Sequence, residues 1–474
     1  TIPDQIPEEV IAARLDLRDR VTFTIDPRDA KDFDDALSIR ALPNGNHELG
    51  VHIADVTHYM PRGSTLDTEA YARATSVYLV DRVIPMLPER LSNGVCSLRP
   101  NEDKLTYSCI MELTPEGKLA DYAIRETVIH SGQRFVYDEV QQVLDGQAEH
   151  RFEPELRQLQ TLAETLMKNR FEAGSINFET PEPRFVLDEN GRPVDVIVKE
   201  RLFAHRLIEE CMLMANKTVA LHVDNLRKES RKRYPFFYRI HDRPDTEKLE
   251  AVLENVRPLG IQVKSAEALE PKHINQLLKQ VEGTHVEILV NELMLRAMAK
   301  AVYSPKNIGH FGLAFTHYAH FTSPIRRYPD VVVHRLLKAY AGGTAAYSMP
   351  DLESAGRHCS QQERSATEAE RDSVKLKQVE FLSERIGQEY EGVISGVTEH
   401  GFYVQLRDIY CEGMVRMSEL KDDYYVYTPQ RHALVARGRG RQYQLGQDVR
   451  VRVLSTDTKR RHIDLGLARD SKRA

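Results

Sequence analysis

The chain has 474 residues, of which 41% are hydrophobic and 29% are charged, and its formal net charge is −6. This length and composition exclude a disordered or fibrous protein and predict a globular one with two or three domains. The sequence contains no run approaching the roughly 18 apolar residues of a membrane span, and its first residues lack the basic and apolar regions of a secretory signal.

The cysteines indicate the compartment of the protein, and the charges bear on whether it binds nucleic acid. Five cysteines are scattered and form neither a C-x-x-C motif nor a zinc-type pairing with histidine, which is typical of a reducing cytoplasm. The negative net charge gives no general sign of a nucleic-acid partner. Residues 387–474, however, hold 15 Lys or Arg against 12 Asp or Glu. The basic runs 437–441 and 459–461 are either phosphate contacts or a solvated charged face.

The first informative element is a cluster of four aspartates: Asp26, Asp32, Asp34 and Asp35. The cluster lies between two strand-like runs, residues 21–25 and 36–39, so a turn is expected to gather the carboxylates. Two carboxylates about 4 Å apart repel by roughly 4 kcal/mol at an effective dielectric near 20, so such a site binds protons or hard cations. Turn capping explains one or two aspartates equally well, whereas four favour a magnesium or manganese site.

From about residue 15 to residue 345 the pattern mixes strands and helices without repeats, which predicts one large α+β domain. Within it, residues 50–56 are predicted as a buried strand and residues 203–220 as a helix. Residues 349–386 form a charged stretch, rich in Gln and Glu, with a proline near its start and few helix breakers. This stretch predicts a long helix that leads into a separate module.

The last module, residues 387–469, alternates hydrophobic and polar residues. Five short strands are predicted in it, at residues 390–397, 402–406, 413–415, 449–454 and 462–467. Five strands in about 80 residues indicate a small OB barrel, on which aromatic and arginine side chains commonly contact single-stranded nucleic acid. Phe402, Tyr403 and Arg461 are the candidates, although strand alternation allows only one of the two aromatics to face outward.

Six longer motifs accompany the aspartate cluster: VHIADV at 51–56, IPMLPE at 84–89, HRLIEECM at 205–212, FTSPIRRYPD at 321–330, GV followed by GFYV within 396–404, and MVRMSEL at 414–420. In this order they resemble the motifs of the ribonuclease II / ribonuclease R family, and those of ribonuclease R more closely. The resemblance covers the whole chain, and motifs of this length in the right order make it specific.

The resemblance implies an α+β fold in which a large mixed α/β catalytic domain is followed by a small all-β OB-fold barrel. The parts are expected at residues 1–345 for the core of an RNB catalytic domain, 346–386 for a long helix that completes it, 387–469 for an OB-fold RNA-binding domain named after ribosomal protein S1, and 470–474 for a short basic tail.

The family hydrolyses RNA processively from the 3′ end to nucleoside 5′-monophosphates. The resemblance implies Mg²⁺ as the cofactor, with Mn²⁺ as a substitute. The expected substrate is single-stranded RNA or an RNA 3′ overhang, and the protein is expected to be a cytoplasmic monomer without membrane contact.

Two cations about 3.5–4 Å apart can activate water and hold the leaving oxygen of a phosphodiester, and four carboxylates could support such a pair. The resemblance assigns Asp26 and Asp35 to one metal, and Asp32 and Asp34 to the second metal or to the orientation of water. Asp34 is the expected catalytic carboxylate. Arg326 is the expected phosphate clamp, because a guanidinium grips two phosphate oxygens and stabilises charge in the transition state.

The resemblance also implies which residues contact the substrate, at positions of this chain that match the family. Tyr78 and Phe178 match aromatics that stack on terminal bases in the family, although without the resemblance Phe178 is predicted as a core residue. Glu210 and Tyr137 match positions that contact ribose, where the 2′-hydroxyl distinguishes RNA from DNA. Further RNA contacts are expected from Arg327, Tyr403 and Arg461. The alternative role for Arg326 is a structural ion pair, and the sequence favours that role for the adjacent Arg327.

The sequence departs from the family in two respects. The two cold-shock domains that usually precede the catalytic domain are absent from a chain that begins at Thr1 without an initiator Met, so a trimmed or natural short form is expected. In the barrel, His400 and Arg416 replace a usual aromatic and a usual histidine. The leading interpretation is a hydrolytic exoribonuclease. The alternatives are a catalytically inactive RNA-binding protein on the same fold and, with less support, a magnesium-dependent endonuclease or deoxyribonuclease.

Overall fold

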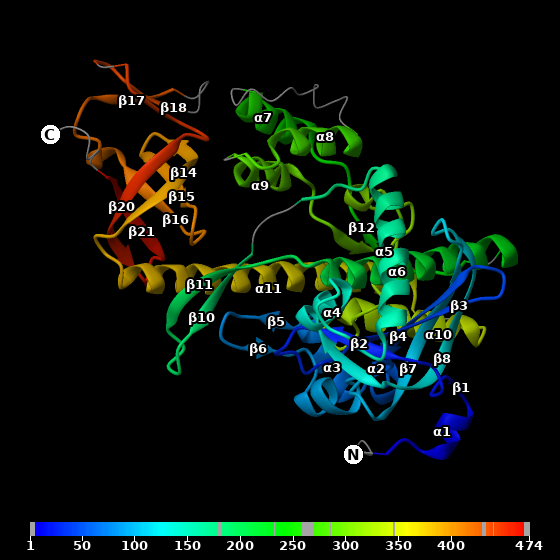
Figure 1. The fold of residues 1–474 in the computed structure, drawn as a ribbon. Coiled ribbons are helices and arrows are strands. Elements are labelled where there is room, and N and C mark those ends of the chain that lie inside the picture. The colour runs from blue at the N-terminus through cyan, green and yellow to red at the C-terminus, as the bar shows by residue number, and fades with distance from the viewer. Residues whose placement is uncertain are drawn as a thin grey trace.

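The computed structural model describes residues 5–178, 182–231, 233–257, 270–284, 286–344, 347–428, 433–438 and 440–468. A large mixed part built on one sheet is followed by a small β-rich part, and the long helix α11 (Met349–Ser383) runs between them (Figure 1). The predicted α+β class with a terminal barrel is therefore confirmed. The division at residues 345, 386 and 469 stays a prediction, and residues 345, 346 and 469–474 lie outside the described part.

The large part is centred on a seven-stranded sheet with the order β1-β8-β7-β4-β3-β2-β9. Its strands are β1 Leu15–Asp16, β2 Phe23–Asp26, β3 Asp35–Ala41, β4 His47–Ala54, β7 Asp103–Leu113, β8 Leu119–His130 and β9 Gln133–Val136. The strands β3, β4, β7 and β8 form antiparallel pairs, while β9 pairs with β2 in parallel. Residues Leu49–Ala54 of β4 are buried, as the apolar run at 50–56 predicts.

Three helices pack against this sheet: α4 Tyr137–Leu144, α5 Glu153–Glu172 and α6 Phe203–Ser230. The predicted helix 203–220 is confirmed, but the helix continues beyond Ala220 because Val223 and Leu226 extend its apolar face. It ends at Arg231, whose backbone adopts the left-handed conformation with φ 55°. A fourth helix, α10 (Tyr328–Ala341), is nearly all buried, and its Lys338 ammonium lies over the ring of Tyr107 in β7.

Smaller elements surround this core. The helices are α1 Glu8–Ala12, α2 Val56–Tyr59, α3 Thr65–Arg73, α7 Thr246–Val256, α8 Pro271–Val281 and α9 Glu287–Ala297, and the strands are β5 Val77–Tyr78, β6 Val83–Ile84, β10 Glu182–Leu187, β11 Pro193–Lys199, β12 Tyr238–Ile240 and β13 Val302–Ser304. Helices α7, α8 and α9 share a hydrophobic cluster of their own. No helix in the described ranges is both long enough and apolar enough to cross a membrane.

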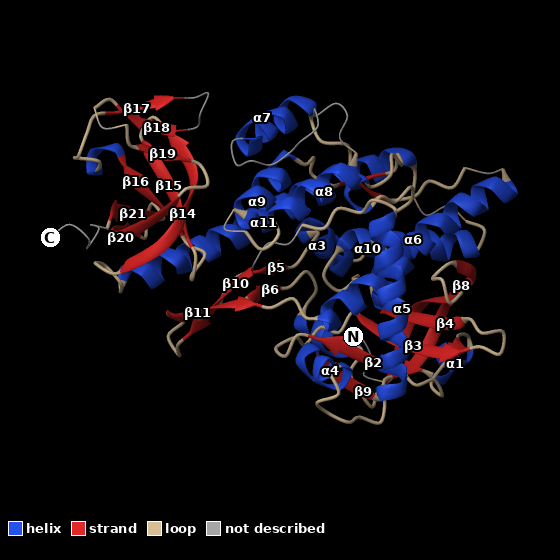
Figure 2. Ribbon diagram, turned by 45° about the horizontal axis from the view of Figure 1, so that its top comes forward, coloured by secondary structure: helices blue, strands red, loops and turns tan. Residues whose placement is uncertain are grey.

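The small part contains a closed barrel with the strand order β14-β15-β16-β21-β20 (Figure 2). Its strands are β14 Glu389–Thr398, β15 Gly401–Leu406, β16 Glu412–Arg416, β20 Asp448–Asp457 and β21 His462–Leu467. All five predicted strands are confirmed. A three-stranded sheet between β16 and β20 was not predicted: β17 Tyr425–Thr428, β18 Ala433–Ala436 and β19 Gln442–Gln444. Their segment shows no alternation, because Ala433–Ala436 is apolar at all four positions.

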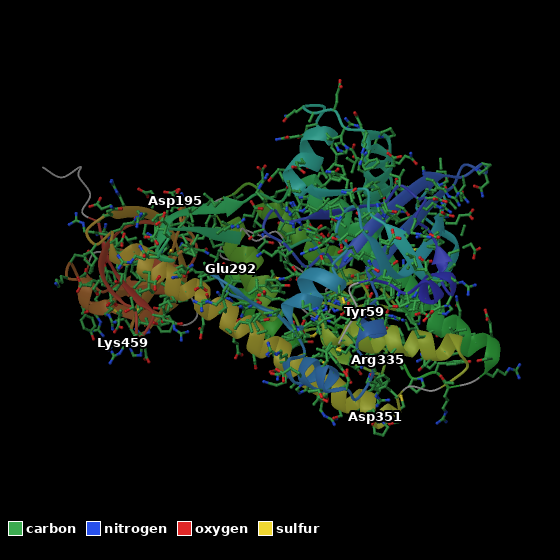
Figure 3. All side chains as sticks on the ribbon, turned by 90° about the horizontal axis from the view of Figure 1, so that it is seen from below. Tyr59, Asp195, Glu292, Arg335, Asp351 and Lys459 are labelled. Carbon is green, nitrogen blue, oxygen red and sulfur yellow. The ribbon has the colours of Figure 1, made fainter. Side chains whose placement is uncertain are left out.

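Helix α11 is part of the barrel core as well as a connector. Its start is capped by the Ser348 hydroxyl, which accepts from the Asp351 amide, and the predicted helix is confirmed. Near its end, Val379 and Phe381 are buried in the same hydrophobic cluster as Phe402 of the barrel. The barrel also contacts α9, where Glu292, labelled in Figure 3, accepts a hydrogen bond from Gln405. The barrel is thus packed against elements of the large part.

Candidate active site

The aspartate cluster lies at the junction of two neighbouring strands. Asp26 is the last residue of β2, Asp35 is the first residue of β3, and residues 27–34 connect them. The two strands are antiparallel neighbours in the sheet, with Phe23 opposite Leu37. The turn predicted from the two strand-like runs is therefore confirmed, and both ends of the cluster are attached to the central sheet.

The loop between the strands is held at both ends by buried or partly buried polar groups. At its start, Arg134 of β9 donates from Nη2 to the carbonyl oxygens of Pro27 and Arg28, at 2.6 and 3.0 Å. Near its end, Ser97 Oγ accepts from the Phe33 amide at 3.0 Å. Because the loop is already restrained, its carboxylates lose less conformational entropy when they bind a ligand than those of a mobile loop would.

Asp34 is the most constrained of the four carboxylates. Its backbone oxygen accepts from the Ala54 amide at 2.9 Å, and its Oδ1 accepts from the Ile325 amide at 2.8 Å. The Arg326 Nε lies 3.5 Å from Asp34 Oδ2. The motif at 321–330 is therefore brought directly against the aspartate loop, although nearly 300 residues separate the two in the sequence.

Burial makes these carboxylates difficult to ionise. Asp26 is 8% exposed, and its burial, with the charge of Asp35 second, raises its pKa to about 8. Burial raises the pKa of Asp35 to about 6, against the opposing effect of Arg326. The pKa of Asp34, which is 4% exposed, is raised well above its usual range by burial, and the pKa of Asp32 is raised for the same reason. In the metal-free protein these carboxylates therefore hold protons more tightly than free aspartates do, and their full ionisation requires a compensating cation.

The residues present fit a hard divalent cation. Within the described ranges, no three His, Cys, Asp or Glu side chains are gathered closely enough to form a finished metal site. However, Oδ2 of Asp26 and Oδ2 of Asp34 are buried and make no hydrogen bond within those ranges. Buried carboxylate oxygens without donors are costly unless a cation or a proton compensates them. Since every potential metal ligand in the cluster is a carboxylate oxygen, magnesium and manganese are the matching metals.

These pKa shifts predict how the stability of the metal-free protein depends on pH. Asp26 binds a proton more tightly in the folded state, so the folded protein holds more protons than the unfolded chain between pH 3.8 and about 8. The free energy of unfolding should therefore fall as pH rises through this window, by up to about 1.4 kcal/mol per pH unit for one such group. Thermal melts in EDTA at pH 5, 6, 7 and 8 measure this slope.

Two comparisons show whether Asp26 causes the slope. Asp26→Asn should reduce it, because the asparagine does not titrate, while Asp32, Asp34 and Asp35 still contribute. Saturating Mg²⁺ should restore stability most strongly at pH 8, where the carboxylates are ionised. An equal slope in the wild type and in Asp26→Asn would contradict the assigned origin.

Arg326 and Arg327 have different environments although they are adjacent. Arg326 is 43% exposed at its side chain and is held by one hydrogen bond, from Nη2 to Ser323 Oγ at 3.0 Å, besides its approach to Asp34. Arg327 donates from Nη2 to Asp330 Oδ1 at 2.7 Å, and Asp330 is fully buried. Arg326 is thus available to a ligand. Arg327 forms the structural ion pair that the sequence offered as its alternative, and its contact with RNA stays a prediction.

Tyr78 is attached to the same segment. The Ser76 amide donates to the Arg326 carbonyl oxygen at 3.0 Å, and Thr75 forms a β-bridge with Arg327. Tyr78 itself is 40% exposed, and a hydrogen bond from its side chain is among the groups that lower the pKa of Asp32 against the larger effect of burial. The structure therefore brings this predicted stacking residue beside the aspartates and Arg326, in a partly exposed position.

Tyr137 also lies beside the cluster. It begins α4 and stacks on His205 of α6, with ring centroids 4.0 Å apart and an interplanar angle of 15°. Burial raises the pKa of its hydroxyl, and the charges of Asp35 and Asp26 add to the shift. The hydroxyl is therefore neutral at physiological pH and can donate a hydrogen bond, as a contact to ribose requires.

Glu210 has a strong partner within the protein. It is 3% exposed, and its Oε1 accepts from Arg170 Nε and Nη2 at 2.9 and 2.5 Å. The pair lines a pocket of about 530 Å³ between the β7–β8 turn, α5 and α6. Because Arg170 uses Oε1 only, Oε2 remains for the predicted contact to ribose, which stays a prediction.

Phe178 is the least accessible of the predicted stacking residues. It is partly buried and packs against the cluster shared by α7, α8 and α9, which includes Ile176. This position agrees with the core interpretation that the sequence alone favours. Its stacking on RNA stays a prediction.

In the barrel, the consecutive residues Phe402 and Tyr403 of β15 point to opposite faces, as strand alternation requires. Phe402 is fully buried in the barrel core, whereas Tyr403 is 37% exposed. Arg461 adopts φ 55° and forms an ion pair with Asp372 of α11. The Tyr78 amide donates to Glu370 of the same helix at 2.9 Å. Glu370 and Asp372 are two residues apart and therefore face different sides of α11. RNA contact by Tyr403 and Arg461 stays a prediction.

Sequence reasoning did not identify the residues that hold the aspartate loop. Arg134 and Ser97 contact it from positions that are distant in the chain. Asp34 is bound by the backbone amide of Ile325 rather than by a side chain. A serine and a backbone amide carry no distinctive pattern. The only available signal was the position of Ser97 shortly after the motif at 84–89.

Comparison with known proteins identifies the family of this fold and cluster. The RNB domain model matches residues 14–343, and the S1 RNA binding domain model matches residues 383–468. The chain is 45% identical over 475 residues to ribonuclease R of Aquifex aeolicus, covering 98% of this chain and 66% of that protein. It is 41% identical over 481 residues to ribonuclease R of Thermotoga maritima, covering 99% and 67%. The chain belongs to the ribonuclease R family.

A solved structure of the family agrees with this assignment. Mycoplasma genitalium RNase R in complex with ribose methylated single-stranded RNA superposes with a TM-score of 0.92 at 29% identity, covering 98% of this chain and 73% of that one. The chain spans 57% to 67% of the length of the first four curated ribonuclease R relatives. The activity of those longer proteins therefore comes to this chain as a proposal.

Proposed function

We propose that this protein is a processive, hydrolytic 3′-to-5′ exoribonuclease that degrades single-stranded RNA, or RNA with a 3′ overhang, to nucleoside 5′-monophosphates. The observation that carries the proposal is the group of four carboxylates, two buried and two partly buried, whose ionisation burial opposes, with Asp34 directly against the accessible Arg326 in a chain of the ribonuclease R family. A protein that only bound RNA would gain nothing from this costly negative charge beside a polyanion.

Asp26, Asp32, Asp34 and Asp35 would hold two Mg²⁺ ions, for which Mn²⁺ is a substitute, with Asp26 and Asp35 serving one ion and Asp32 and Asp34 the other. The bound cations would supply a nucleophile at neutral pH and neutralise the leaving oxygen. Asp34, fixed by Ala54 and Ile325, contributes the least mobile carboxylate.

Arg326 would stabilise the charge that develops on the phosphate. Its guanidinium uses one donor on Ser323 and approaches Asp34 with another, which leaves N–H groups for the phosphate oxygens. Such donors, already oriented, stabilise the transition state more than the ground state.

The RNA would be held by aromatic stacking and by contacts to ribose. Tyr78 offers an accessible ring beside the cluster, and Tyr137 and Glu210 offer polar groups that the 2′-hydroxyl could engage. Further contacts are proposed for Phe178, Arg327, Tyr403 and Arg461. A monomer in the reducing cytoplasm is proposed, which agrees with five cysteines that are all free and buried.

A 5′-labelled single-stranded RNA incubated with the protein and Mg²⁺ tests the function. The expected result is stepwise shortening from the 3′ end to a very short product, with release of nucleoside 5′-monophosphates, and loss of the reaction in EDTA. Binding of an RNA that stays intact would establish the catalytically inactive alternative. Internal cleavage fragments or equal activity on DNA would instead support the endonuclease or deoxyribonuclease alternative.

Tyr78→Ala should lengthen or blur the final product while leaving the chemical step intact. Removal of one base-stacking aromatic costs about 1–3 kcal/mol of binding, which weakens the hold on the shortest RNAs first. Denaturing gels that resolve products to the nucleotide measure the change. Tyr424→Ala is the matched control, because this tyrosine is 65% exposed and lies next to β17 in the barrel part. An unchanged product length in Tyr78→Ala would exclude Tyr78 as the residue that sets the end point.

A further inference from the structure

A fully buried serine lies behind the aspartate loop. Ser97 is 0% exposed, and its Oγ accepts from the Phe33 amide at 3.0 Å and donates to the Lys31 carbonyl oxygen at 2.8 Å. The next amide, that of Leu98, donates to the Phe33 carbonyl oxygen at 3.0 Å. Three hydrogen bonds therefore hold the backbone on both sides of Asp32 and immediately before Asp34. Peptide planes fixed in this way set the directions in which the two carboxylates leave the chain.

Ser97 is in turn supported by a short π-helix. Residues Leu91–Val95 form this turn, and the Cys96 amide closes it by donating to the Leu91 carbonyl oxygen at 3.0 Å. π-helical turns are rare and occur frequently at functional sites, because their geometry has to be maintained by other contacts. The turn leads directly into Ser97, so its position determines where the hydroxyl lies.

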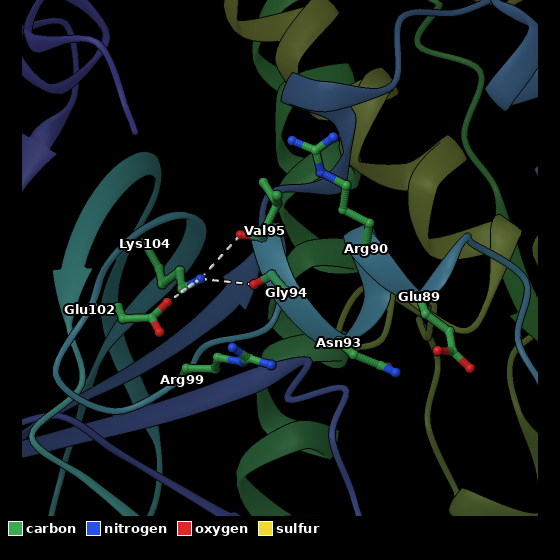
Figure 4. A pocket seen from close by; sticks show the side chains of 8 residues that line it. All are labelled: Glu89, Arg90, Asn93, Gly94, Val95, Arg99, Glu102 and Lys104. Atoms are coloured by element: carbon green, nitrogen blue, oxygen red, sulfur yellow. Dashed lines mark hydrogen bonds and ion pairs between the residues drawn. The ribbon is translucent and has the colours of Figure 1, made fainter. Parts of the chain in front are cut away.

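A buried lysine supplies that support (Figure 4). Lys104 is 7% exposed, and its Nζ donates to the carbonyl oxygens of Gly94 and Val95 at 2.9 and 3.4 Å while pairing with Glu102 at 2.8 Å. The last carbonyls of a helical turn have no partner inside the turn, and an ammonium group satisfies them. On this side the turn borders a pocket of about 430 Å³ rather than packed side chains. The hydrogen bonds from Lys104 therefore hold the turn in place on the side where it borders the pocket.

We propose that Ser97, supported by Lys104 through the π-helical turn, is a positioning residue that orients Asp32 and Asp34 for divalent cations. The inference rests on the proposed function. Arg134 holds the start of the loop, at Pro27. Ser97 holds Lys31 and Phe33, the two residues next to Asp32, and Phe33 also precedes Asp34. Partners in the outer shell of a metal site change metal affinity by about 10–100-fold when they are removed.

Ser97→Ala should weaken binding of Mn²⁺ by about tenfold or more, because the Phe33 amide and Lys31 carbonyl lose their partner and the loop relaxes. The probe is Mn²⁺ alone, titrated into the metal-free protein and followed by calorimetry and by the electron paramagnetic resonance of free Mn²⁺. Lys104→Met should weaken binding in the same direction by a smaller factor, and Lys104→Arg should retain more affinity than Lys104→Met because it keeps a donor.

Two further measurements separate positioning from general damage. Ser360→Ala is the matched control, because Ser360 of α11 is 5% exposed and its hydroxyl also accepts from a backbone amide, that of Tyr303 at 3.0 Å, outside the aspartate loop. Its Mn²⁺ affinity should equal that of the wild type, even if its melting temperature falls as far as that of Ser97→Ala. Ser97→Thr, which keeps the hydroxyl, should recover affinity, and excess Mn²⁺ should restore turnover to Ser97→Ala.

The outcomes distinguish this inference from the function on which it rests. Equal Mn²⁺ affinity in the wild type and in Ser97→Ala would overturn the positioning role while leaving the nuclease intact. The same loss of affinity in Ser360→Ala would overturn it too, because the effect would then reflect stability alone. Absence of Mn²⁺ binding and of RNA cleavage in the wild type would overturn the proposed function first, and the inference with it.

Discussion

Asp34→Asn should abolish RNA hydrolysis and leave RNA binding almost unchanged. Asparagine keeps the size of the side chain, and its Oδ1 can still accept from the Ile325 amide, but one negative charge is lost from the proposed metal site. We expect turnover to fall by roughly 10³-fold or more, the upper end of the cost of removing one preorganised electrostatic contact. Single-turnover kinetics with a saturating RNA measure the chemical step, and fluorescence anisotropy measures RNA binding.

The same substitution should stabilise the metal-free protein. Asp34 is buried with a strongly raised pKa, so its ionised form costs folding energy at neutral pH, and the neutral asparagine removes that cost. A higher melting temperature in EDTA combined with lost turnover would separate a functional carboxylate from a structural one. Asp29→Asn is the control in the same loop, because the side chain of Asp29 is 70% exposed and forms an exposed ion pair with Arg184. Near wild-type turnover in Asp34→Asn would refute its catalytic role.

Arg326→Lys should lower turnover by about 10²–10³-fold, because a lysine keeps the charge but loses the planar fork that binds two phosphate oxygens. The effect should appear mainly in kcat, since the guanidinium is expected to act on charge that develops in the transition state. Steady-state kinetics on a short single-stranded RNA measure the division between kcat and KM. Loss confined to KM would show that Arg326 only binds the substrate.

Arg327→Met provides the contrast within the same motif. Arg327 pairs with the fully buried Asp330, so its removal leaves an uncompensated buried charge and should cost roughly 3–5 kcal/mol of folding free energy. Chemical denaturation measures this loss. Arg326→Lys should unfold at nearly the denaturant concentration of the wild type, because its side chain is 43% exposed and makes one hydrogen bond. Equal destabilisation by the two changes would contradict the division of roles.

The local elements of this protein could be predicted because short-range patterns determine them. The five barrel strands follow from alternating hydrophobicity, and α11 follows from a capped stretch with few breakers. The turn between β2 and β3 follows from two apolar runs that flank charged residues. The strands β17, β18 and β19 were missed, because Ala433–Ala436 is apolar at all four positions and the basic run 437–441 follows it, so the segment shows no alternation.

The sequence by itself determined the family, the four aspartates and the arginine motif, since these depend on residue identity and order. Only the tertiary structure decided how they are held: Ile325 and Ala54 on Asp34, Arg134 and Ser97 on the loop. It also decided that Arg327 forms a buried ion pair while Arg326 stays accessible. The physical reason is that burial and hydrogen bonding between distant segments arise from packing, which leaves no periodic trace along the chain.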